Sequence, residues 1–248
     1  MTPEPEVAWR RPSLRRLRRF WPEVSRQSLL RCLEYERLAD LGLGGKVLDF
    51  GGGEQTNYAA IRSRWHAPAA DVTYESANID EGTRPTYVIT PETHLPVEDE
   101  RYDVVLSLNT FEHIYDLQRT LLELHRVTRD GGMLFFVVPF VFRVHGHPDD
   151  YHRGTPSFWR RRLQEAGFRI DAVDALFWGP FSTAATVVGL PGPFKLARLR
   201  LAMLSDLALA HAARYPVRGP QDAPVLNAPL AYAVRARRVP DRADAHSP

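Results

Sequence analysis

Lys46-Val-Leu-Asp-Phe-Gly-Gly-Gly-Glu-Gln-Thr-Asn-Tyr58 is the most informative stretch of this 248-residue chain. It opens with a short apolar strand that carries an acid, Asp49, near its end. Three glycines, Gly51 to Gly53, follow at once, and apolar residues then recur at helical spacing from Tyr58 to Trp65. A strand, a glycine turn and a helix N-terminus form the opening unit of a nucleotide-binding α/β sheet. Glycine suits the turn because a residue without Cβ lets the backbone bend sharply and approach a ligand.

The residues of this turn narrow the choice of nucleotide. A dinucleotide site has Gly-x-Gly-x-x-Gly, but the third glycine position here is Thr56, and Glu54 would repel a pyrophosphate. S-adenosylmethionine has no phosphate and carries a sulfonium cation, so Asp49 and Glu54 suit it better. An ordinary strand-to-helix turn without a ligand stays open as the alternative.

Composition and charge limit the class of protein. A hydrophobic content of 44% and a charged content of 25% are typical of a soluble globular domain, and the length suffices for one large core. The net charge of +2 gives no reason to expect a nucleic-acid partner. The single cysteine, Cys32, excludes an internal disulfide, and neither a signal peptide nor a membrane-spanning run is evident. We therefore expect a cytoplasmic location.

Residues 1–44 are predicted to form a basic helical cap. Arginines from Arg10 to Arg19 alternate with the apolar residues Leu14, Leu17, Phe20 and Trp21, which is typical of an amphipathic helix. We favour a helix that docks by its apolar face, and peripheral membrane contact through this basic N-terminus stays open as the alternative. A second helix is predicted over Ser25–Leu41 because leucines gather on one side.

The rest of the chain predicts a doubly wound sheet. Strands are expected at 71–79, 87–90, 102–108, 133–138, 168–178 and 230–239, and helices at 115–128 and 157–166. This alternation favours parallel strands covered on both faces. A helical insertion at 179–224 interrupts it before the last strand, and the tail 240–248 is expected to be disordered.

Six short motifs together resemble the class I S-adenosylmethionine-dependent methyltransferases, in particular the members called methyltransferase type 11. The motifs are Val47-Leu-Asp-Phe-Gly-Gly-Gly53, His94-Leu-Pro96, Tyr102-Asp-Val-Val105, Phe111-Glu-His-Ile114, Arg126-Val-Thr-Arg-Asp-Gly-Gly132 and Glu165-Ala-Gly-Phe168. The resemblance implies a Rossmann-like domain over 45–239, whose seven strands lie in the order 3-2-1-4-5-7-6 with the seventh antiparallel. It also implies S-adenosyl-L-methionine as cofactor.

The resemblance places the cofactor on particular residues. Asp49, Gly51, Gly52 and Gly53 would line its methionine moiety, and Asn109 after the fourth strand would also contact it. An acid usually ends the second strand and holds the ribose, and here Asn78 takes that place with Asp80 two residues on. Two departures weaken the pattern. Gln55 replaces the usual last glycine, and the acid expected near the adenine has only Thr90 and Glu92 as candidates.

Two stretches offer groups that could deprotonate a methyl acceptor. His113, with Glu112 beside it, follows the fourth strand at the edge where ligands bind in such sheets, although it could merely shape the pocket. After the fifth strand, His145-Gly-His-Pro-Asp-Asp-Tyr-His-Arg153 gathers many polar groups. We expect His147 to be the first candidate base, followed by His113 and His145.

The same loop offers groups for other roles. Asp150 would orient a histidine, and Tyr151 and Arg153 would bind the substrate. Alternatively, Asp150, Tyr151 and Arg153 pair with one another and with the backbone. A metal site is also conceivable, but the spacing matches no standard motif, so no metal is expected.

Two functions follow from these patterns. The first is methylation of an oxygen on a small molecule, sugar or glycan precursor, with the 179–224 insertion covering the substrate. The second is a non-catalytic module of the same fold that binds a partner through its basic arm and inserted helix. The oligomeric state stays open.

Overall fold

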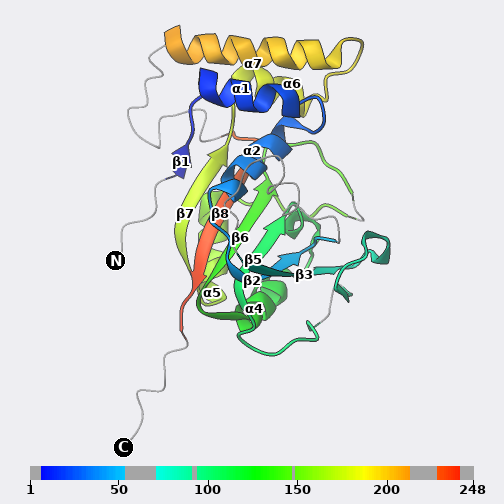
Figure 1. The fold of residues 1–248 in the computed structure, drawn as a ribbon, viewed down its shortest axis with the longest axis vertical. Coiled ribbons are helices and arrows are strands. Elements are labelled where there is room, and N and C mark those ends of the chain that lie inside the picture. The colour runs from blue at the N-terminus through cyan, green and yellow to red at the C-terminus, as the bar shows by residue number, and fades with distance from the viewer. Residues whose placement is uncertain (1–6, 54–70, 91–93, 147–148, 213–227, 241–248) are drawn as a thin grey trace, which may run out of the picture.

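The computed structural model describes residues 7–53, 71–90, 94–146, 149–212 and 228–240, which form one sheet with helices on both faces (Figure 1). The sheet has eight strands in the order β1-β7-β8-β6-β5-β2-β3-β4. The strands are β1 Val7–Trp9, β2 Gly45–Phe50, β3 Val72–Asn78, β4 Tyr87–Val88, β5 Tyr102–Leu108, β6 Thr128–Pro139, β7 Phe168–Leu176 and β8 Ala231–Arg238. β8 runs antiparallel to both β6 and β7, and the other pairs are parallel.

The seven predicted strands correspond to β2 through β8, and their predicted order and antiparallel last strand are confirmed. β1 is an additional edge strand that the sequence analysis did not predict. It pairs in parallel with β7, with Val7 opposite Val173. Three residues are too few to show an alternating pattern, and the arginines interleaved with apolar residues that follow indicate a helix instead.

Two hydrophobic cores lie on opposite faces of the sheet. The helices are α1 Leu14–Glu23, α2 Leu29–Ala39, α4 Leu117–Val127, α5 Pro156–Glu165, α6 Pro180–Val187 and α7 Lys195–Ala212, with short 3₁₀ helices η1 Glu81–Thr83 and η2 Phe111–His113. Residues of α1, α2 and α7 share one core with Val47 of β2, whereas α4 and α5 share the other with Leu48. Because successive residues of β2 are buried on both faces, the strand is apolar without alternation. The helix predicted after the glycine turn lies outside the described residues.

Helix α1 packs by its apolar face into the core that it shares with α2 and α7, as the favoured alternative predicts. Leu17 and Phe20 are buried, and the Phe20 ring lies 5.2 Å from that of Trp178. Arg16 donates to Glu36 at 2.7 Å, and its guanidinium lies 5.1 Å from the centre of the Trp178 ring. The arginine side chain therefore contributes packing as well as charge. Among the described helices, none has the length and apolar character needed to cross a bilayer.

The insertion between β7 and β8 contains α6 and α7, which pack on each other beside α1 at one end of the sheet (Figure 1). The N-cap residue of α6 is Gly179, which has no side chain to cap the helix. Asp206 of α7 supplies one, because its carboxylate accepts from the backbone N–H groups of Phe181 and Ser182, both at 2.9 Å. At the other end of α6, a Cβ on Gly189 would lie 3.2 Å from the Arg143 guanidinium. The insertion thus reaches the loop that follows β6.

Candidate active site

The glycine turn after β2 is closely packed, so side chains cannot be added to it. Gly51 has φ +91°, and a Cβ there would lie 2.0 Å from Oγ1 of Thr110. At Gly52 a Cβ would lie 2.2 Å from Oδ2 of Asp49. The first position therefore needs glycine for its backbone conformation, and both positions need it for space.

Polar side chains around the turn fix its shape. Asp49 is 1% exposed and accepts a hydrogen bond from the Tyr74 hydroxyl. The Asn78 side-chain amide donates to the Gly51 carbonyl at 2.8 Å, while its own oxygen accepts from the Asp80 backbone at 3.0 Å. Asn78 thus holds the turn in this structure, and its contact with a ribose stays a prediction. Asp80 is exposed at the end of β3, where its carboxylate also accepts from a backbone N–H of η1.

Behind the turn lie Arg31 and Glu34, which the sequence did not place at the site, together with Asn109, which it did. Arg31 of α2 forms an ion pair with the fully buried Glu34 at 3.0 Å. Burial raises the pKa of Glu34 even though Arg31 opposes that effect. The pKa of Arg31 is raised chiefly by Glu34, and Asp49 and Glu112 also contribute, so this cation lies within electrostatic reach of both parts of the site. Asn109, at φ +53° after β5, has a buried side-chain oxygen without a hydrogen-bond partner among the described residues.

No sequence pattern singles out Arg31 and Glu34, because the burial of nearly every residue of α2 is seen only in the structure. Ten of the eleven residues of α2 are buried, and besides the leucines they include two glutamates and one arginine. A charged residue such as Glu34 on a helix that is buried nearly all round departs from the usual amphipathic pattern. The leucine stripe was interpreted only as packing, which concealed this polar contribution.

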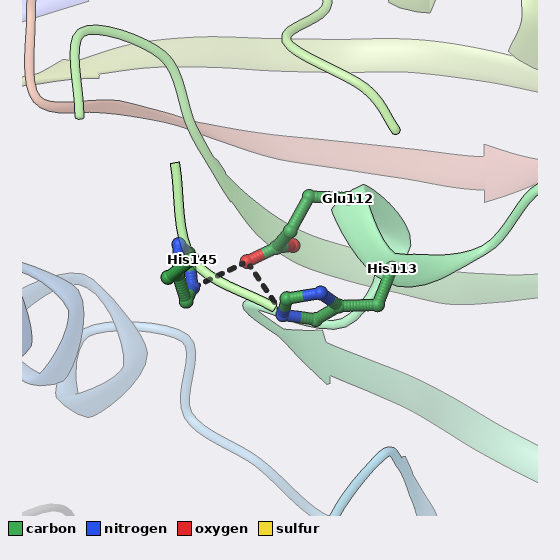
Figure 2. A group of neighbouring side chains, drawn as sticks. All are labelled: Glu112, His113 and His145. Atoms are coloured by element: carbon green, nitrogen blue, oxygen red, sulfur yellow. Dashed lines mark ion pairs between the residues drawn. The ribbon is translucent and has the colours of Figure 1, made fainter. Parts of the chain in front are cut away.

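Glu112, His113 and His145, here called the Glu112 cluster, converge at the carboxyl edge of β5 and β6 (Figure 2). Oε1 of Glu112 lies 3.6 Å from Nε2 of His113 and 3.9 Å from Nε2 of His145. Glu112 is fully buried, and burial raises the pKa of its carboxyl to about 8. The structure therefore brings together the two histidines that were predicted from separate stretches.

The start of η2 anchors this cluster in the core. Phe111 is fully buried, and its ring lies 5.0 Å from that of Phe136 and 6.1 Å from that of Trp159. The Glu112 carbonyl accepts backbone hydrogen bonds from Tyr151 at 2.6 Å and from His152 at 3.3 Å. These contacts join the two segments that carry the cluster, so its geometry follows from packing and backbone bonds.

The loop after β6 contains contacts of both kinds that the sequence predicts. Asp150 lies beside His145, and it also pairs with Arg153 within the loop. Asp150 accepts from the His145 backbone at 3.0 Å and lies 3.5 Å from Nδ1 of that histidine, which fits its predicted orienting role. Both Asp150 oxygens also accept from Arg153. Burial acts to raise the pKa of Asp150, but the bonds from Arg153 and His145 outweigh it and lower the pKa. Substrate binding by Arg153 stays a prediction, and His147 lies outside the described residues.

Two tyrosines lie beside the cluster, and only one of them was predicted. Tyr151 donates to Asp149 at 2.9 Å and is 46% exposed. Tyr115, just after η2, is 81% exposed, and the two rings meet edge to face with centres 5.4 Å apart. Tyr115 was missed because a single tyrosine at the start of a predicted helix carries no distinguishing pattern.

Comparisons with known proteins agree with this architecture. A family model described as a methyltransferase domain matches residues 17–173. A sarcosine/dimethylglycine N-methyltransferase of Halorhodospira halochloris is 32% identical over 87 residues, which are 30% of each chain. A malonyl-[acyl-carrier protein] O-methyltransferase of Coxiella burnetii is 30% identical over 143 residues, which are 56% of this chain and 49% of that one. The chain thus matches half or less of the length of these curated relatives.

Solved structures share the fold at low sequence identity. A Haloferax volcanii methyltransferase, solved in complex with the Trm112 activator, superposes with a TM-score of 0.56 at 16% identity, covering 94% of this chain and 96% of that chain. A Burkholderia thailandensis 1,6-didemethyltoxoflavin-N1-methyltransferase, solved with S-adenosylhomocysteine, gives a TM-score of 0.50 at 14% identity, covering 88% and 81%. With the family match over more than half of its length, the chain belongs to the class I S-adenosylmethionine-dependent methyltransferases.

Proposed function

We propose that this methyltransferase transfers the methyl group of S-adenosylmethionine to a hydroxyl of a small sugar or glycan precursor. The observation that carries the proposal is the Glu112 cluster, which lies on the same sheet edge as the glycine turn. An amine acceptor can attack as its free base, whereas a hydroxyl needs assistance to lose its proton. A buried carboxylate with two imidazoles is suited to give that assistance.

The reaction is an in-line displacement. The acceptor oxygen forms a bond to the methyl carbon, the bond from that carbon to the sulfonium sulfur breaks, and the hydroxyl proton leaves at the Glu112 cluster. The products are the methyl ether and the neutral thioether S-adenosylhomocysteine. Because the methyl group is already activated, much of the rate enhancement comes from holding the acceptor oxygen in line with the methyl–sulfur bond.

Charges around the glycine turn suit the cofactor. The carboxylate of its methionine end would pair with Arg31, whose charge also acts on Asp49. The sulfonium cation would be favoured by the nearby acids, and the exposed Asp80 would accept hydrogen bonds from the ribose hydroxyls. Asp80 is better suited to this than Asn78, whose amide is bonded to the turn.

The exposed tyrosine pair supports a sugar-like acceptor. Tyr115 and Tyr151 offer apolar ring faces with polar hydroxyls beside the Glu112 cluster, and such surfaces suit ligands that are apolar on one side and polar on the other. The α6–α7 insertion would cover the acceptor, since the end of α6 reaches Arg143, two residues before His145. A small polar molecule held between these elements would present its hydroxyl to the cluster.

The test separates cofactor binding from turnover. Binding of S-adenosylhomocysteine is measured by calorimetry, and methyl transfer is measured with labelled donor against a panel of sugars, nucleotide sugars and amines. We expect His113→Ala and His145→Ala to lower turnover by about 10²–10⁴-fold while cofactor affinity stays within about twofold. The matched control is His94→Ala, because His94 pairs with Glu123 at 3.1 Å outside the cluster.

Two results would overturn the proposal. Methylation of amines alone would show that the hydroxyl assignment is wrong. Failure of the purified chain to bind S-adenosylmethionine or its product would favour the alternative, a module that keeps the fold and binds a partner through its basic arm and inserted helix.

A further inference from the structure

The carboxylate of Glu112 is buried and makes no hydrogen bond to another described residue. Its side chain is fully excluded from solvent, and neither oxygen has a hydrogen-bond partner among the described residues. The nitrogens of His113 and His145 face Oε1 at 3.6 Å and 3.9 Å, which is too far for a hydrogen bond. Buried carboxylates are normally hydrogen-bonded, paired or bound to a metal ion. Oε1 and the two nitrogens therefore face one another without a hydrogen bond between them.

The two imidazoles are oriented by their other nitrogens. Nδ1 of His113 bonds to the carbonyl oxygen of Asp149. Nδ1 of His145 lies 3.3 Å from the carbonyl oxygen of Arg143 and 3.5 Å from Oδ2 of Asp150. Carbonyl oxygens only accept hydrogen bonds, so these contacts favour a proton on each Nδ1, which leaves Nε2 of a neutral imidazole with the lone pair that a metal ion needs. Metal-binding histidines are oriented by the same kind of contact to a carbonyl or a carboxylate.

We propose that Glu112, His113 and His145 bind one divalent transition-metal ion between Oε1 and the two Nε2 atoms. The candidate ligand atoms lie within 4.8 Å of one another (Figure 2). Ligands at about 2.0–2.2 Å from Zn²⁺ lie roughly 3.3–3.6 Å apart at tetrahedral angles, so small side-chain movements would close the site. Two imidazoles and one carboxylate favour zinc, cobalt, iron or manganese over magnesium or calcium.

Three protein ligands leave a coordination position open, as in metal sites that act on a substrate. With the ion bound, the cluster atoms would no longer be free to take the hydroxyl proton. The acceptor hydroxyl would instead occupy the open position, where its pKa would be lowered and its oxygen fixed, and its proton would pass to a water molecule. This role rests on the proposed function, whereas the binding of the ion does not. The sequence predicted no metal because two ligands are adjacent and the third lies beyond β6, a spacing that matches no standard motif.

The experiment measures metal binding directly. The full chain is stripped of metal with a chelator, dialysed, and titrated with Co²⁺ or Zn²⁺ by calorimetry, and the Co²⁺ form is also followed by visible absorption. We expect one equivalent to bind and the cobalt spectrum to report nitrogen and oxygen ligands. Glu112→Gln, His113→Ala and His145→Ala should each weaken binding by about 100-fold or more, since loss of even an outer contact costs about 10–100-fold.

Two controls keep the result interpretable. Glu112→Gln preserves the shape of the side chain, and circular dichroism checks that each variant folds. His94→Ala should bind the metal like the parent chain, because the His94–Glu123 pair has no third ligand in the described structure. Binding of less than one equivalent by the parent chain, or an affinity in the three cluster variants equal to that of the parent chain, would overturn the proposal.

Activity distinguishes this proposal from the proposed function. If the chain binds the metal at the cluster but methylates no hydroxyl, the proposed function fails and the metal site stands. If hydroxyl methylation proceeds equally in the metal-free chain and no ion binds, the metal site fails and the proposed function stands.

Discussion

Replacing Glu75 by glutamine should destabilise the chain in a way that depends on pH. Glu75 of β3 accepts from Arg101 at 2.6 Å, from the Tyr102 hydroxyl at 2.6 Å and from the Tyr87 hydroxyl at 2.9 Å. Burial acts to raise the pKa of this carboxyl, but these three partners outweigh it and lower the pKa from 4.5 to about 2. The network ties β3, β4 and β5 together beside the strand end that carries Asp80.

The size and sign of the effect follow from this pKa difference. A pKa lowered from 4.5 to about 2 corresponds to about 3 kcal/mol of unfolding free energy. The side chain is 14% exposed, so water screens part of the interaction and we expect about 2–3 kcal/mol at pH 7. Because the pKa is lower in the folded chain, this stabilisation is fully present above about pH 4.5 and is lost as the pH falls toward 2.

Urea unfolding followed by tryptophan fluorescence measures this difference. At pH 7, Glu75→Gln should unfold at a lower urea concentration than the parent chain, and at pH 3 the difference in unfolding free energy should fall by about half or more. The control is Glu98→Gln, an exposed position where the change should stay within about 0.5 kcal/mol. An equal difference at pH 7 and pH 3, or one below about 0.5 kcal/mol at pH 7, would refute the reasoning.

Three further substitutions test other parts of the structure. Gly51→Ala should lower the unfolding free energy by about 1–2 kcal/mol because of the positive φ at this position. It should also abolish measurable cofactor binding, because the added Cβ would lie 2.0 Å from Thr110 and displace the turn, and unchanged affinity would contradict this. Arg31→Met should weaken S-adenosylhomocysteine binding about tenfold in calorimetry, and Arg31→Lys should be intermediate. If both variants bind as tightly as the parent chain, Arg31 does not belong to the cofactor site. Asp206→Ala should lower the unfolding free energy by about 2–3 kcal/mol, because two backbone N–H groups lose their acceptor, and Asp206→Asn should lower it less. A change below about 0.5 kcal/mol in Asp206→Ala would show that α6 needs no cap.

Regular strands were predictable because their residues show the pattern of burial directly. The predicted strand 102–108 has the same bounds as β5, since its centre is apolar on both faces. β6 begins at Thr128, five residues before the predicted strand 133–138. The predicted strand starts later because Asp130-Gly131-Gly132 has a composition typical of a turn. In the structure these residues belong to β6, while its pairing with β5 shifts register between Tyr102 and Val104. A glycine-rich irregularity within a strand and a true turn have similar composition, so local sequence could not separate them.

The site was predictable in position but not in its contacts. The rule that ligands bind at the carboxyl ends of parallel strands located His113 and the loop containing His145. It could not show that Oε1 of Glu112 faces both imidazoles, because that depends on backbone bonds between η2 and the loop. It also could not show that Arg31 of α2 lies within electrostatic reach of the turn, since α2 precedes β2 in sequence and reaches the site only by tertiary packing.

The Glu112 cluster is where local rules and the observed structure disagree, and the disagreement itself indicates function. A carboxylate at that position lowers stability if it is ionised, because it is buried and has no hydrogen bond among the described residues. The surroundings nevertheless fix it firmly, with Phe111 held in the aromatic core on one side and the Glu112 carbonyl bonded to Tyr151 on the other. A merely structural position would be served better by an apolar side chain of similar size. A polar group that is costly to bury yet rigidly placed, at the edge where the glycine turn lies, is best explained by a bound partner that the carboxylate is positioned to meet.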